Sequence, residues 1–110
     1  MIKNCFINDN EFFNYDITID GEIVAKAHTL TFNDKQKCFK QTENGIEIDY
    51  NHLVKSALDE WFLTDKNGKP VEFNLANIKL LTGKLFTEIC LQIMNHENKV
   101  NAEAQEIEKN

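Results

Sequence analysis

The chain has 110 residues, of which 42% are hydrophobic and 27% are charged, so it can form one core and is not a wholly disordered chain. The net charge is −6, and every one of the 12 basic residues is lysine. The guanidinium group of arginine makes the bidentate hydrogen bonds by which many proteins bind phosphates and base edges. Because this chain has no arginine and is acidic, we expect no direct binding of nucleic acid.

Three cysteines, Cys5, Cys38 and Cys90, are far apart and form no C-x-x-C pair. This usage is typical of reduced thiols in a cytoplasmic protein. The N-terminus lacks the long apolar core of a signal peptide, and no apolar run approaches the ~18 residues that span a bilayer. We therefore expect a cytoplasmic protein without membrane contact.

Apolar and polar residues alternate along residues 12–19 and again along 22–32. A period of two is typical of half-buried strands. Between the two runs, Asp20 and Gly21 accept the positive φ angles of a tight turn. The pattern predicts an antiparallel β-hairpin. Residues 1–11 carry a single apolar cluster, which fits an edge strand or a docked arm.

Residues 33–48 fit two templates. Asn33 and Asp34 would cap a short helix that runs to about Thr42. The same residues fit a strand that turns at Gly45 and returns through residues 46–48. The spacing favours the helix slightly.

Asp49 is a good N-cap, and apolar residues then recur at i, i+1, i+4, i+5 and i+8. The pattern predicts a helix from Asp49 to about Leu63. Its apolar face comprises Leu53, Val54, Ala57, Leu58 and Trp61. A polar turn follows over residues 64–70, where Gly68 permits a left-handed conformation and Pro70 disfavours a helix in the residue before it.

Asn74 caps a second predicted helix of about 20 residues, 75–95. Its apolar stripe comprises Ile78, Leu81, Leu85, Ile89 and Ile93, widened by Leu75, Phe86, Cys90 and Met94. Gly83 costs ~1 kcal/mol inside a helix and predicts a kink or close packing. We expect one α+β domain over residues 1–96, with the hairpin followed by two main amphipathic helices. Residues 97–110 form a charged tail that extends the helix or frays.

No motif for catalysis or for a cofactor occurs in the chain. His28, His52 and His96 have no metal-ligand spacing to one another or to a cysteine. The turn from Asp65 resembles the start of a calcium loop, but Asn74 stands where that loop needs glutamate. We therefore expect no catalytic, cofactor-binding or metal-binding residues, and no enzyme activity.

Adjacent aromatic residues predict a contact surface. Neighbouring side chains diverge by about 100° on a helix, so one of Trp61 and Phe62 leaves the core. Together with Phe73, they are the candidate partner-binding residues, because exposed apolar patches usually mark a partner surface. Coverage by short terminal segments explains the same pattern equally well.

The stretch from Trp61 to Asn74 reads WFLTDKNGKPVEFN, and NIKLL follows at 77–81. Over about residues 49–95 the chain resembles small phage and prophage tail assembly chaperone-like proteins. In that family a helix ends in Trp, and an acidic-Gly-Lys/Arg-Pro turn leads to a helix that opens with Asn-Ile/Leu and a Leu pair. Thr82-Gly83 departs from the family's Pro-containing step. The resemblance implies a non-enzymatic protein that shields an aggregation-prone tail protein during assembly.

The acidic balance favours a second hypothesis. A small protein with net charge −6 can mimic nucleic acid and block a host defence or nucleic-acid-processing enzyme. Such binding would weaken as salt is added. Under both hypotheses the partner is another protein, and the oligomeric state is not indicated.

Overall fold

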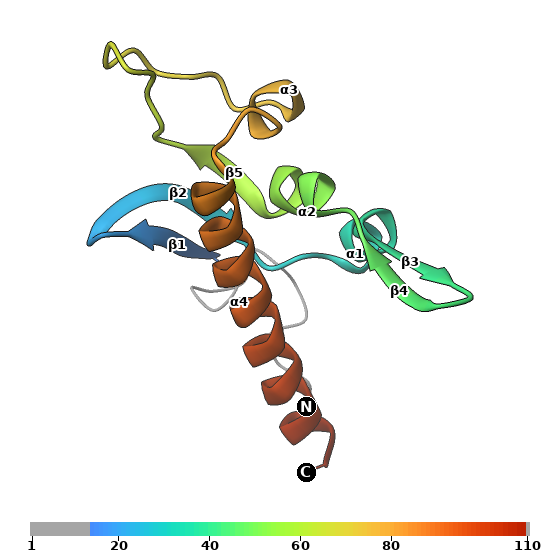
Figure 1. Cartoon of the computed structure of the whole chain (residues 1–110). Coiled ribbons are helices and arrows are strands. Elements are labelled where there is room, and N and C mark those ends of the chain that lie inside the picture. The colour runs from blue at the N-terminus through green and yellow to red at the C-terminus, as the bar shows by residue number, and fades with distance from the viewer. Residues whose placement is uncertain (1–13, 110) are drawn as a thin grey trace.

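The computed structural model describes the backbone of residues 14–109 and the side chains of residues 14–100 (Figure 1). Its elements are, in order, β1 (Asn14–Ile19), β2 (Glu22–His28), α1 (Phe32–Cys38), β3 (Phe39–Thr42), β4 (Gly45–Ile48), α2 (Tyr50–Ala57), β5 (Leu58–Trp61), α3 (Leu75–Ile78) and α4 (Gly83–Lys109). The α+β class and the N-terminal hairpin are confirmed. The predicted second strand, 22–32, is too long, because β2 ends at His28 and Phe32 already belongs to α1, whose cap is Thr31. The predicted edge strand or arm at 1–11 lies outside the described residues.

The hairpin of β1 and β2 turns at Asp20 and Gly21, whose φ angles are 53° and 81°. Two positive φ angles are typical of the type I′ turn, whose twist matches that of the paired strands. The register shifts once, between Ile17 and Thr18. Strand β5 pairs with the other edge of β2, which gives a three-stranded antiparallel sheet in the order β1-β2-β5.

Residues 33–48 contain both of the structures that the sequence allowed. Helix α1 begins after Thr31, which forms a capping box with Asp34: each side chain accepts the other residue's backbone N–H at 3.1 Å. The N-cap is therefore Thr31 rather than Asn33 or Asp34. The helix ends at Cys38, and β3 and β4 then form a separate two-stranded sheet with Gly45 at φ 118°.

The prediction of a helix from Asp49 to Leu63 is wrong beyond Ala57. The cap is correct, because the Asp49 carboxylate accepts the His52 N–H at 3.1 Å. After Ala57 the chain extends into β5 and pairs with β2. Leu58 and Trp61 are buried in the strand, and a helix would also place them on its apolar face, so the apolar spacing did not distinguish the two conformations. Hydrogen bonds from the free edge of β2 favour the strand.

The predicted helix 75–95 is also interrupted. Helix α3 is capped by Asn74, which accepts the Asn77 N–H at 2.8 Å, but it ends at Ile78. A turn over residues 79–82 precedes α4, which starts at Gly83. Gly83 thus lies at a helix end, where it neither kinks a helix nor meets a neighbour within 4 Å. Helix α4 runs through the predicted tail to Lys109.

Helix α4 lies across the three-stranded sheet, and its C-terminal half extends beyond it (Figure 1). Ile89 and Ile93 of α4 are fully buried against the sheet and α2. The other core residues are Ile17, Ala25, Ala27, Leu30, Cys38, Leu53, Val54, Ala57, Leu58, Trp61, Ile78 and Cys90. Among the described residues, no helix has both the length and the apolar character to span a membrane.

Candidate partner-binding groove

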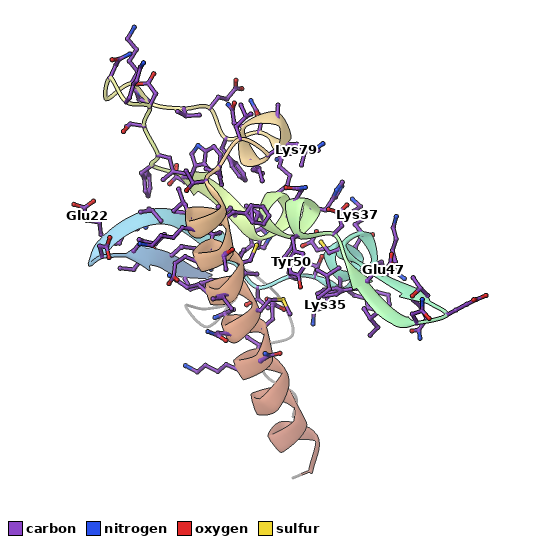
Figure 2. All side chains as sticks on the ribbon, viewed as in Figure 1. Glu22, Lys35, Lys37, Glu47, Tyr50 and Lys79 are labelled. Carbon is purple, nitrogen blue, oxygen red and sulfur yellow. The ribbon has the colours of Figure 1, made fainter. Side chains whose placement is uncertain are left out.

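An uncharged groove lies between the start of α2 and the middle of α4. It has a volume of about 280 Å³ and is lined by Tyr50, Phe86, Thr87, Cys90, Leu91 and Met94. Tyr50 is 47% exposed and Leu91 is 53% exposed, although both carry large apolar surfaces. Figure 2 labels Tyr50 at the beginning of α2, on the side of α4. Apolar side chains that are exposed next to one another make this groove a candidate contact site.

The two walls of the groove are held by separate parts of the fold. One wall consists of successive turns of α4, because Phe86, Cys90 and Met94 are four residues apart and share a face. The other wall is Tyr50, the first residue of α2. The residue before it is tied to α1, since the Asp49 N–H donates to the Cys38 carbonyl oxygen at 2.8 Å. The groove is therefore a boundary between two anchored helices.

The groove suits binding better than covalent chemistry. Cys90 is its only thiol, and its side chain is 7% exposed. Burial raises the pKa of that thiol to about 11. The thiol is thus protonated at neutral pH, and a protonated thiol is a poor nucleophile.

The three predicted contact residues lie at a different place, the base of the loop after β5. Trp61 is only 7% exposed, and its Nε1 donates to the Val71 carbonyl oxygen at 2.7 Å. Its ring meets Phe73 edge-on at 5.1 Å, and the Lys55 ammonium lies 4.9 Å from the Phe73 centroid. Phe62 is 48% exposed. One aromatic of the adjacent pair is thus inside and the other outside, and a partner contact here stays a prediction.

Three polar side chains attach α4 to other parts of the fold, and we call Gln92, His96 and Glu97 the clasp. The Gln92 amide makes two hydrogen bonds to the Thr18 backbone on β1. One turn later, the His96 ring stacks on Tyr15 with centroids 3.7 Å apart.

The clasp also reaches the segment between β2 and α1. His96 Nε2 is hydrogen-bonded to Thr29 Oγ1 at 2.8 Å. The Leu30 N–H donates to Glu97 Oε2 at 3.0 Å, and Lys35 Nζ lies 3.7 Å from Glu97 Oε1. The clasp therefore ties α4 to two segments that are distant in sequence.

Burial dominates the electrostatics around the clasp. Glu97 is 4% exposed, and burial raises the pKa of its carboxyl group. Burial also raises the pKa of Tyr15, assisted by the charges of Glu97 and Asp59. Burial, followed by the Lys99 charge, lowers the pKa of His96. Within the described part of the chain, Tyr15 Oη and Glu97 Oε1 are buried without a hydrogen-bond partner.

The remaining candidate ligands are engaged in structural contacts. His28 Nδ1 lies 2.7 Å from Asp59 Oδ1, and His52 lies beside the Asp49 cap. The Asp65 side chain accepts backbone N–H groups of its own turn, from Asn67 and Lys69. Over the residues whose side chains are described, no three His, Cys, Asp or Glu side chains are grouped to hold a metal ion.

The sequence predicts three of the six groove residues as part of an apolar stripe, but it does not predict the groove. Three of the four residues that widen the predicted apolar stripe, Phe86, Cys90 and Met94, line the groove, whereas Leu75 does not. The signal in the sequence is an apolar stripe that is wider than a single contact with the core needs. Tyr50 gave no such signal, because its position beside α4 depends on the tertiary fold. No protein-family model, curated protein or solved structure matches this chain.

Proposed function

We propose that the protein is a non-enzymatic binding protein that holds an apolar segment of another protein in the groove between α2 and α4. The observation that carries the proposal is the uncharged lining with Tyr50 and Leu91 half in solvent. Covering a large apolar side chain contributes about 1.5–3 kcal/mol when burial is complete. A partner therefore gains most where these two residues are covered.

We further propose that the partner is a phage or prophage tail protein, bound in the host cytoplasm during tail assembly. The resemblance to tail assembly chaperone-like proteins supports this assignment, and it covers residues 49–95. All six groove residues fall inside that stretch, with Tyr50 near its start and Met94 near its end. The resemblance and the groove thus concern the same part of the molecule.

Co-expression with the tail tape-measure or tail-tube protein tests the proposal. We expect a soluble complex with one of them. Leu91→Asp should weaken binding tenfold or more, because burying an unpaired ionised carboxylate costs more than the ~1–3 kcal/mol of an unpaired neutral polar group, and about 1.4 kcal/mol is already tenfold. Leu80→Asp is the matched control, since Leu80 is 80% exposed and lies outside the groove.

Two outcomes separate the assignments. A complex that tolerates Leu91→Asp but is lost with Phe62→Asp would move the contact from the groove to the predicted aromatic surface. No complex with either tail protein would refute the tail assignment. A salt series tests the rival inhibitor hypothesis, because binding through an uncharged groove should persist at high ionic strength, whereas binding through acidic charge should not.

A further inference from the structure

The clasp lies on the same helix as one wall of the groove but contacts different partners. Gln92 Oε1 accepts the Thr18 N–H at 3.0 Å, and Gln92 Nε2 donates to the Thr18 carbonyl oxygen at 2.7 Å. This is the pair of hydrogen bonds that a neighbouring strand would make at the edge of β1. A two-point hydrogen bond fixes direction as well as distance.

Apolar packing alone would not hold α4 so closely. Ile89 and Ile93 anchor the helix in the core, but the hydrophobic effect is non-directional. A small rotation of α4 about its axis would keep both residues buried while moving Cys90 and Leu91 relative to Tyr50. The hydrogen bonds of Gln92 oppose that rotation.

The other wall does not depend on β1. Tyr50 follows Asp49, whose N–H donates to the Cys38 carbonyl oxygen and whose side chain caps α2. The two walls also meet directly, because α2 packs against α4. That packing is apolar and non-directional, so the clasp is the directional contact that orients α4 against the sheet.

We infer that Gln92 is the positioning residue of the groove: by fixing α4 to the edge of β1, it sets how the α4 wall faces Tyr50. His96 and Glu97 extend the same attachment to Thr29 and Leu30. The inference deepens the proposed function, and it rests on that proposal for its biological meaning. The geometry itself is measured without a partner.

Thiol reactivity tests the inference in a Cys5→Ser background that retains Cys38 and Cys90. Cys90 lines the groove, whereas Cys38 is fully buried in α1. Gln92→Met keeps the length of the side chain and removes both hydrogen bonds to Thr18, together with the one that Gln92 Nε2 donates to Glu88 on the same helix. We expect Cys90 to be alkylated about tenfold faster than in the Cys5→Ser parent, because losing ~1.4 kcal/mol of hydrogen bonding changes an equilibrium tenfold. The alkylation rate of Cys38 should change by less than about twofold.

Asn95→Ala is the control, because Asn95 is exposed on the same helix and does not line the groove. If Gln92→Met does not fold, Gln92→Glu, which places an oxygen against the Thr18 carbonyl oxygen, should show the same selectivity. An unchanged Cys90 rate, or equal acceleration of both thiols, would overturn the inference. Failure of wild-type protein to bind a tail protein would refute only the proposed function, since the ratio of the two thiol rates needs no partner.

Discussion

Trp61→Phe should destabilise the fold far more than the same kind of substitution at an exposed aromatic residue would. The indole Nε1 donates to the Val71 carbonyl oxygen at 2.7 Å, and the ring is 7% exposed. Phenylalanine removes the donor and part of the ring volume. The lost hydrogen bond costs about 1–1.5 kcal/mol and the cavity about as much, so we expect the free energy of unfolding to fall by about 2–3 kcal/mol.

Urea denaturation followed by far-ultraviolet circular dichroism measures this change, because Trp61 is the only tryptophan and its fluorescence is lost in the variant. The midpoint temperature should fall by roughly 10–20 °C for a domain of this size. A loss below about 0.5 kcal/mol would refute the assignment of Trp61 as the anchor of the loop.

A double-mutant cycle separates the two contacts of Trp61. Phe73→Leu removes the edge-on ring contact at 5.1 Å, and its coupling with Trp61→Phe should be about 0.5–1.5 kcal/mol. Phe62→Ser is the matched control, because Phe62 is adjacent but 48% exposed. Its cost should stay below about 1 kcal/mol. Coupling near zero would mean that Phe73 does not support the tryptophan.

Three further predictions concern Tyr15, Glu97 and two glycines. Tyr15→Phe should leave the free energy of unfolding unchanged or raise it by up to about 1 kcal/mol, since it removes a buried hydroxyl group without a partner; a clear loss in urea denaturation would show that the hydroxyl group is satisfied. The raised pKa of Glu97 means that its contribution to stability is present below the unfolded value of 4.5 and is lost as pH rises through the folded value. Stability measured against pH should therefore fall across that interval in the wild type relative to Glu97→Gln, and parallel curves would contradict this. Gly83→Ala should raise the free energy of unfolding by about 0.4–1 kcal/mol, and with it the melting temperature, because an added Cβ meets nothing within 4 Å. Gly21→Ala should lower the melting temperature, because the φ of Gly21 is 81°.

The features that the sequence predicted correctly are decided by neighbouring residues. The turn at Asp20 and Gly21 needs only two residues that tolerate positive φ. The caps at Asp49 and Asn74 need only a side chain that reaches an N–H group three residues later. Such signals survive any arrangement of the rest of the chain.

The errors concern residues whose structure depends on distant partners. Leu58 and Trp61 are spaced for a helix, but β2, more than 30 residues earlier, offers a free edge that turns them into a strand. The interruption at residues 79–82 carries no proline to announce it. Tertiary packing decided both cases over local propensity.

The predicted contact surface shows the same limit at the level of the site. Adjacency of Trp61 and Phe62 correctly implies that one of them leaves the core, yet the sequence cannot say what the inner residue does. In the fold the inner residue is Trp61, which holds a loop closed through Val71. Phe62 remains the accessible member of the pair.

Helix α4 presents three faces, and only two of them are used within the described fold. Ile89 and Ile93 fill the core, and the clasp binds β1 and the segment before α1. The third face leaves Leu91 half in solvent beside Tyr50. Under the proposed function this exposure has a use, because a bound partner would cover Leu91 and Tyr50 and gain the free energy of burying both.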